Sequence, residues 1–176
     1  MKGDKKLNKI FDLKYAKSFG QGRNLSVTLR KNFKGISMYA TKDIRKNAIV
    51  AYYKFLVKKY DEDKDGVKNN MYTIIVYTKK DRESSKFIGD VYEGSLREPR
   101  FNIPFWGYFS NEPATKQKNN AFLDINLKEN YKNRTRVKEG DTMIYKIRAL
   151  KNIKKGEEIT WCYGDGYVRD YPTSCS

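Results

Sequence analysis

Short β-type segments run along most of this 176-residue chain, and no stretch shows the long 3.6-residue period of an amphipathic helix. Residues 24–31 alternate apolar and polar side chains, and residues 48–57 are rich in β-branched and aromatic ones. Turn residues separate the segments, for example at Glu139-Gly140 and Lys155-Gly156. The pattern predicts one mostly β domain of short strands in several small sheets, with few short helices. The expected strands are 24–31, 48–57, 71–78, 87–92, 121–127, 142–150 and 158–163.

The segment from Gly156 to Gly164, of sequence GEEITWCYG, contains the last expected strand. It is typical of a turn followed by a short strand, and it places the phenol of Tyr163 directly before a glycine bend. Taken alone, Tyr163 is expected to be a core tyrosine with a satisfied hydroxyl. A buried strand that ends in a phenol and a bend also suggests a site, so both interpretations stay open at this point.

Two upstream segments combine small and aromatic residues in a similar way. Gly35 to Ala40 has the sequence GISMYA, and Phe109 to Pro113 has the sequence FSNEP. Alone, the first predicts an ordinary turn into a strand, and the second predicts a turn with a capping asparagine. The order of the three segments along the chain is more informative than any one of them.

In this order the three segments resemble the motifs of the SET domain family of protein lysine methyltransferases. The family's opening motif is G-x-G-hydrophobic-aromatic-A, its central motif is R-F-x-N-H-S-x-x-P-N, and its closing motif is G-E-E-hydrophobic-T-aromatic-x-Y-G. Residues 156–164 match the closing motif in full. The resemblance implies the SET fold, in which the central and closing motifs cross in a C-terminal pseudoknot.

The resemblance also implies a reaction: the transfer of a methyl group from S-adenosyl-L-methionine to a lysine side chain of a protein, histone or non-histone. Tyr163 would be the catalytic tyrosine, with Trp161 and Tyr167 in the substrate channel. The residues that the resemblance assigns to the cofactor are Gly35, Ile36, Ser37, Met38, Tyr108, Phe109, Ser110, Asn111, Glu112 and Asn120.

Several positions depart from the family pattern. Ser37 replaces a glycine, Tyr108 an arginine and Glu112 a histidine. Asn47 replaces the glycine before the next strand and tolerates similar backbone angles. The departures leave an alternative open, a catalytically inactive SET module that binds chromatin or nucleic acid through its basic surface. A structural protein whose strands only imitate the motifs is a second alternative.

The residue types of the chain suit methyl transfer. There is no histidine, which removes the usual general base, Ser-His catalysis and the commonest metal ligand. Methyl transfer needs a neutral lysine amine, and burial in an aromatic channel favours the neutral form. Aromatic faces also stabilise a sulfonium cation, and carbonyl oxygens contact a polarised methyl group. A tyrosine can orient the amine without being a strong base.

Lysine and arginine outnumber acidic residues by 37 to 21, which gives a net charge of +16. This charge suggests a polyanionic partner such as nucleic acid or chromatin, and a lysine-rich surface that only solvates the protein explains it equally well. Because no apolar run could span a membrane and no secretory signal is recognisable, we expect an intracellular protein of the nucleus or cytoplasm. Cys162 and Cys175 could form a disulfide, but in a reducing setting Cys162 is expected to be a core residue.

The expected organisation is a basic arm at 1–24, a SET domain at 25–165 with a variable insert at 54–86, and a short tail at 166–176. The tail is too short for the zinc-binding module that follows many SET domains, so Tyr167 or Tyr171 would close the site instead. Residues 61–66 match the first half of a calcium-binding loop, but Tyr72 stands where that loop needs a glutamate. We therefore expect a charged hairpin there and no bound metal.

Overall fold

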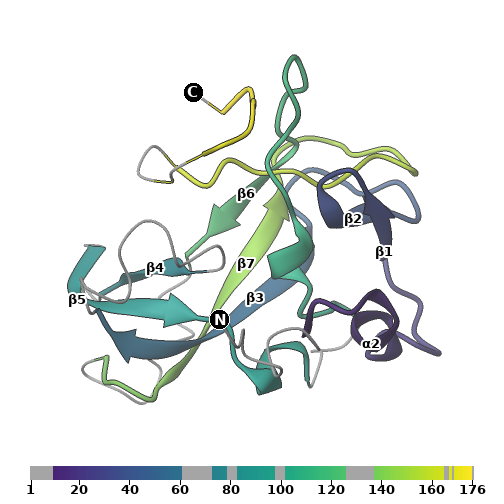
Figure 1. Cartoon of the computed structure of the whole chain (residues 1–176). Helices are drawn as coiled ribbons and strands as arrows, with labels where there is room; N and C mark the ends of the chain where they lie inside the picture. Colours follow the sequence, from purple (N-terminus) through teal and green to yellow (C-terminus); the bar gives the residue numbers. More distant parts are fainter. Residues whose placement is uncertain are drawn as a thin grey trace.

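The computed structural model is mostly β, with few short helices, as the strand pattern predicts (Figure 1). It describes residues 10–60, 73–78, 83–97, 102–125, 137–164, 167 and 169–175. The calcium-like loop and Tyr72 lie outside the described residues, as do parts of the strands expected at 71–78 and 121–127.

A five-stranded sheet forms the larger part of the fold, in the order β4-β5-β3-β7-β6. All its neighbouring strands are antiparallel. The central strand β3 is buried along most of its length, which suits its β-branched and aromatic composition. The strands are β3 (Ile49–Lys59), β4 (Ile74–Tyr77), β5 (Glu83–Asp90), β6 (Ala121–Asp124) and β7 (Thr142–Ala149).

Strands β1 (Val27–Asn32) and β2 (Gly35–Ala40) form a separate antiparallel hairpin. Gly35 follows the turn with a φ of 100°, an angle that favours glycine. The GISMYA segment is therefore a turn into a strand, as expected. Asn47 has a φ of 68°, so the prediction that it adopts glycine-like backbone angles is confirmed.

The helices of the described residues are short: α2 (Leu13–Ser18), η1 (Glu93–Leu96) and η2 (Gly107–Phe109). Helix α2 lies beside β1 (Figure 1). Part of the expected basic arm packs on the domain, because Ile10 and Ala16 are buried and the Trp106 indole donates to the Ala16 carbonyl over 3.2 Å. Among the described residues, no helix combines the length and apolar character that crossing a membrane would need.

The strand predicted at 158–163 is wrong in detail, because the segment forms isolated bridges instead of a regular ladder. Glu158 pairs with Tyr39 of β2, and Thr160 pairs in the parallel sense with Asn111. The Ile159 amide donates to the Met38 carbonyl over 2.8 Å. Successive residues thus pair with different neighbours on two sides. The closing segment lies between β2 and the central motif, which brings the three motif segments together.

The middle of the closing segment belongs to the hydrophobic core through Ile159 and Trp161, while its ends at Gly156 and Gly164 are exposed. Phe55 and Ile147 from the five-stranded sheet, Leu29 and Met38 from the hairpin, and Ile159 from the closing segment are all fully buried in one cluster. The core therefore fixes the residues on either side of Ile159 relative to both sheets.

Candidate active site around Tyr163

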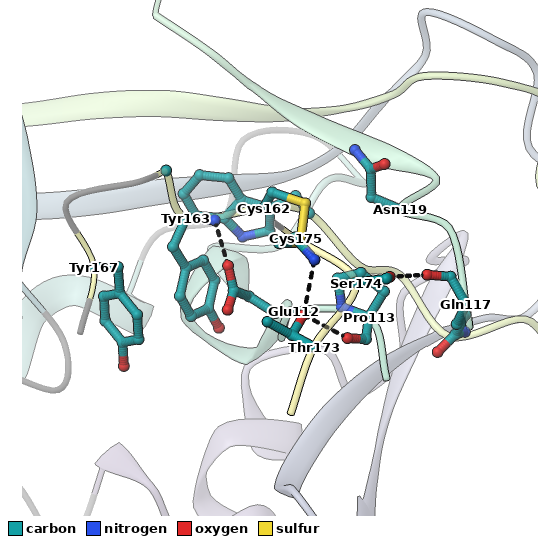
Figure 2. The surroundings of a disulfide bond; sticks show 12 residues. Glu112, Pro113, Gln117, Asn119, Cys162, Tyr163, Tyr167, Thr173, Ser174 and Cys175 are labelled. Atoms are coloured by element: carbon teal, nitrogen blue, oxygen red, sulfur yellow. Dashed lines mark hydrogen bonds between the residues drawn. A yellow bond between two sulfur atoms is a disulfide. The ribbon is translucent and has the colours of Figure 1, made fainter. Parts of the chain in front are cut away.

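Tyr163 is held at both its backbone and its phenol by the central motif. Its amide donates to Oε1 of Glu112 over 2.8 Å, and its hydroxyl donates to the Ser110 carbonyl over 3.2 Å. The edges of two further aromatic rings meet it, with centroids 5.0 Å away for Trp161 and 4.9 Å away for Tyr167. Figure 2 shows the Glu112 carboxylate turned toward the Tyr163 backbone, with the Tyr163 and Tyr167 rings side by side. The structure therefore brings the predicted catalytic and channel residues together.

Burial raises the pKa of the Tyr163 phenol well above its ordinary value of 10.0, and neighbouring Tyr171 and Tyr53 raise it further. The phenol is therefore neutral at physiological pH. A neutral phenol donates one hydrogen bond and accepts others. It can orient an amine, but it does not supply a tyrosinate base.

The carbonyl of Ser110 is shared between two aromatic side chains. Besides the Tyr163 hydroxyl, it accepts the indole N–H of Trp161 over 3.0 Å. The Ser110 hydroxyl in turn donates to the Ile159 carbonyl over 3.2 Å. Trp161 is buried, so its indole supports the phenol from the core side.

Asn111 joins the central motif to the opening motif. Its side-chain nitrogen donates to the Ser37 hydroxyl over 2.7 Å and to the Ile36 carbonyl over 3.2 Å. Ser37, a departure from the family pattern, is fully buried and provides Asn111 with an acceptor that a glycine lacks. The expected cofactor residues of the two motifs are thus directly connected.

Whereas Asn111 contacts the opening motif, the Glu112 side chain contacts the C-terminal tail as well as the Tyr163 amide. Its carboxylate accepts a two-pronged contact from Arg169, with Nε–Oε2 and Nη2–Oε1 distances of 2.7 Å each, and the Tyr171 hydroxyl over 3.0 Å. Burial alone would raise the pKa of Glu112, but the bonds from Arg169, the Tyr163 amide and Tyr171 lower it below the ordinary 4.5. Glu112 is therefore ionised and fully paired.

Besides Ser37, Ser110 and Glu112, four of the residues expected to bind the cofactor have buried side chains that contact other parts of the protein. Met38 is fully buried, and Phe109 packs edge-on against Phe11 at 6.2 Å between centroids. Tyr108 packs on Tyr53, with centroids 4.1 Å apart, and its hydroxyl contacts the Lys54 carbonyl and the Ser95 hydroxyl. Burial raises the Tyr108 pKa. That these residues bind the cofactor stays a prediction, and they could do so only through their backbone atoms.

Asn120 is the fourth of these residues. Its side-chain nitrogen donates to the Glu158 carbonyl over 2.8 Å, and its side-chain oxygen accepts the Thr160 amide over 2.9 Å. Both ends of the amide therefore hold the closing segment. This geometry gives Asn120 a role in fixing the segment that carries Tyr163.

The closing segment is covalently attached to the tail. Cys162 and Cys175 form a disulfide with their Cα atoms 5.4 Å apart (Figure 2). The tail also lies against the loop after the central motif, because the Thr173 hydroxyl donates to the Pro113 carbonyl over 2.8 Å. The sequence left this pairing open, and the structure differs from the expectation of a free, buried Cys162.

Arg169 and Lys34 are site residues that the sequence analysis missed. Lys34, in the β1–β2 turn, pairs with Glu158 at 2.8 Å and donates to the Glu112 carbonyl over 3.1 Å. For Arg169 a signal existed: a buried glutamate in place of the family's histidine needs a cation. For Lys34 no comparable signal exists, because lysines occur along the whole chain.

The residues around Tyr163 fit a sulfonium cofactor in their chemistry. Aromatic rings surround the phenol, and π-faces favour a cation. On the opening side, a Cβ atom built on Gly35 would meet no atom within 4 Å, so space is open beside the start of β2. The small residue Gly35 thus lies on the side of the opening motif, which Asn111 contacts. The aromatic rings lie on the side of Tyr163, which Glu112 contacts.

A separate hollow in the surface includes none of the predicted site residues. Lys17, Gln21, Arg23 and Trp106 are among the residues that line it. Within the part of the chain that the structure describes, no tyrosine lines this hollow, so we place the candidate site at Tyr163.

A comparison with protein families matches residues 35–164 to the SET domain. Similar solved structures include a proposed histone methyltransferase of Plasmodium falciparum, with 15% identity, a TM-score of 0.43, and coverage of 81% of this chain and 96% of that chain. Another is the methyltransferase domain of human PR domain-containing protein 2, with 20% identity, a TM-score of 0.46 and 85% coverage of both chains. The comparison with curated proteins finds no match. The family match spans all three motif segments.

Proposed function

Because the chain belongs to the SET domain family, we propose that it transfers a methyl group from S-adenosyl-L-methionine to a lysine side chain of a protein substrate. The observation that carries the proposal is the position of Tyr163. Its neutral phenol lies among aromatic rings at the end of an intact closing motif, and its hydroxyl and amide both bond to the central motif.

In this proposal the residues around Tyr163 act by positioning and desolvation. The rings of Trp161, Tyr163 and Tyr167 exclude water, which favours the neutral amine of the incoming lysine. The Tyr163 hydroxyl, whose proton points to the Ser110 carbonyl, accepts a hydrogen bond from that amine and orients its lone pair.

The opening and central motifs would hold the cofactor. Asn111 and the backbone of residues 35–38 are the groups that the family pattern assigns to it, and their mutual hydrogen bonds pre-organise them. The bound cofactor supplies an electrophilic methyl group on a sulfonium. The side chains of Tyr108, Phe109 and Asn120 support this arrangement from the interior.

The test is the Tyr163→Phe variant, assayed with labelled S-adenosyl-L-methionine on core histones and a cell extract. We expect methyl transfer to fall by about a hundredfold or more, as for other groups that act at the reacting centre. Cofactor affinity, measured by calorimetry, should change by less than about threefold. Undiminished transfer would refute the role of Tyr163.

The matched control is Tyr145→Phe. The Tyr145 hydroxyl bonds to the Tyr77 amide over 3.0 Å and to the Ile75 carbonyl over 3.1 Å, within the five-stranded sheet. This variant loses a buried phenol's hydrogen bonds outside the site. Once corrected for the folded fraction, its transfer rate should equal that of the wild type.

The protein's positive charge supports chromatin or nucleic acid as a partner during this reaction. Ile44 and Ile153 pair in a bridge that brings two basic loops together. The loops expose six cationic side chains against two acidic ones. Reversing these charges should weaken binding to duplex DNA and flatten its salt dependence. The six cations are Lys42, Arg45, Lys46, Lys151, Lys154 and Lys155, and the two acids are Asp43 and Glu157.

A further inference from the structure

Glu112 carries a buried charge for which the proposed reaction has no use. Its side chain has 0% exposure, and that of its partner Arg169 has 16%. Burying a carboxylate is unfavourable unless it is paired and hydrogen-bonded. A glutamate at this position therefore depends on the groups that surround it.

The donors to this carboxylate come from two separate segments. The closing motif contributes the Tyr163 amide at 2.8 Å from Oε1. The tail contributes the Arg169 guanidinium in a parallel, two-pronged contact, and the Tyr171 hydroxyl at 3.0 Å from Oε2. Charge-assisted and bidentate bonds of this kind are the strongest in proteins. One carboxylate thus connects the backbone of Tyr163 to the tail.

Arg169 transmits this connection to the channel. Its Nη1 donates to the Tyr167 carbonyl over 2.9 Å, and its Nη2 donates to the Gly164 carbonyl over 2.8 Å. These bonds join Arg169 to the backbone of Gly164, directly after Tyr163, and of Tyr167. The same guanidinium that binds Glu112 also lies 5.6 Å from the centroid of the Tyr167 ring, which packs against Tyr163.

We propose that Glu112 is a positioning residue for methyl transfer, whose carboxylate couples the backbone of Tyr163 to the docked tail residues 169–175 through Arg169 and Tyr171. The proposal rests on the function proposed above. The family's histidine could not replace it, because an imidazole cannot accept a two-pronged guanidinium contact. Glu112 and Arg169 therefore form one functional unit in this chain.

Amide hydrogen exchange of the full-length protein tests the coupling without a substrate. In Glu112→Gln we expect exchange at the Tyr163 amide and in residues 169–175 to accelerate about tenfold or more, because the charge-assisted contact is lost. The Ile159 amide, which bonds to Met38 and not to Glu112, should be unchanged. Arg169→Gln should give the same pattern, and the double variant should be no worse than either single one.

The matched control is Asp124→Asn, which removes a partly exposed ion pair with Arg148 on β6 and β7. It should leave both the Tyr163 amide and the tail unchanged. If Glu112→Gln fails to fold, Tyr171→Phe removes one donor only and should give a smaller acceleration at the same amides. Exchange that is unchanged in the Glu112 or Tyr171 variant, or that rises equally at Ile159, would overturn the proposal.

The kinetic signature separates positioning from a loss of stability. In Glu112→Gln, kcat for methyl transfer should fall about tenfold while S-adenosyl-L-methionine affinity changes less than about threefold. A fall in cofactor affinity alone would contradict the positioning role. If the wild type itself transfers no methyl group, the proposed function fails, and the exchange experiment still decides whether Glu112 couples the tail to Tyr163.

Discussion

The closing segment is held differently on its two sides. On one side, which we call the sheet side, β2, Asn111 and Asn120 bind it mostly through backbone groups, including the Ile159 amide on the Met38 carbonyl at 2.8 Å. On the other, the tail side, it is held by the Glu112–Arg169 pair, the Tyr171 hydroxyl and the Cys162–Cys175 disulfide.

This difference separates two kinds of stability. Apart from the Lys34–Glu158 ion pair, the sheet side consists of backbone amides, carbonyls and asparagine side chains, which do not titrate and cannot be reduced. A carboxylate and a disulfide respond to pH and to thiols. The sheet side should therefore keep Ile159 and Thr160 in place in the core under all mild conditions, whereas the tail side, which contacts the Tyr163 amide through Glu112, should be adjustable. A change on one side that leaves the other unaffected would show that the two sides are independent.

The largest effect is expected for Asn120→Ala on the sheet side. This change leaves the Glu158 carbonyl and the Thr160 amide, both bonded to Asn120, without their partners. Two buried polar groups without partners should cost about 4 kcal/mol of unfolding free energy. Urea denaturation measures this loss.

Its neighbour Asn119 provides the control. Asn119 makes one side-chain bond, to the Ala121 carbonyl over 3.3 Å, and is partly exposed. Asn119→Ala should cost about 1 kcal/mol or less. Equal losses for the two variants would mean that the closing segment does not depend on its sheet side.

Next in size is the loss of the disulfide on the tail side through Cys175→Ser. The bond joins residues 13 positions apart, and a loop of this length contributes up to about 3 kcal/mol when the whole chain unfolds. We expect accelerated amide exchange in the tail and unchanged exchange at Ile159. Treating the wild-type protein with a dithiol should reproduce the variant.

If Ile159 exchanged faster in Cys175→Ser, the two sides would not be independent. The same measurement bears on location. Disulfides persist mainly in oxidising compartments, and an intracellular setting remains our proposal. A tail that stays docked after reduction would fit that setting, because Glu112 and Thr173 would hold it without the disulfide.

The sheet side is also the side that the sequence predicts. The alternating segments predict the strands. The order of the three motifs, through the resemblance to the SET family, predicts that Tyr163 lies beside residues 109–113. The expected regular strand at 158–163 fails because its residues pair with two different segments far away in the chain. Periodicity shows that a segment is extended, but it does not show which neighbour each residue will meet.

The tail side could not be predicted in the same way. Its contacts depend on the path of the chain after Gly164, and no local pattern in residues 167–175 shows that Arg169 turns back to Glu112. The departures from the family pattern were the available signal. The side chains of Ser37, Tyr108 and Glu112 each form a hydrogen bond within the protein, so each departure from the family pattern is matched by a contact of its own.

A third prediction concerns pH and the tail side. The folded-state pKa of Glu112 lies below its ordinary 4.5. Its ionised form therefore stabilises the docked tail above pH 4.5, and this stabilisation is lost as the pH falls through the folded-state pKa. The charged and titratable groups that face Glu112 are Arg169, Tyr171, Tyr167 and Tyr163, with the Lys34 amine on its carbonyl.

The pKa values of Tyr163, Tyr167 and Tyr171 are all raised, chiefly by burial, so these neighbouring phenols stay neutral between pH 7 and pH 4. Tail exchange, corrected for the intrinsic pH dependence of amides, should therefore accelerate below pH 4.5 in the wild type and not in Glu112→Gln. An identical profile in both proteins would assign the effect to another carboxylate.

The smallest effect is expected for Ser37→Ala on the sheet side. The change removes the hydroxyl that accepts the Asn111 amide at 2.7 Å, but Asn111 keeps its bond to the Ile36 carbonyl at 3.2 Å. One of two bonds from a single donor group is lost, so unfolding free energy should fall by about 1 kcal/mol. Calorimetry should show cofactor affinity reduced by less than about fivefold, since the backbone of residues 35–38 stays in its strand.

Ser37→Gly, which restores the family's residue, should lose slightly more stability because glycine adds backbone entropy to the unfolded chain. A large loss of affinity in both Ser37→Ala and Ser37→Gly would show instead that the Ser37 hydroxyl, through its bond to Asn111, is needed to bind the cofactor.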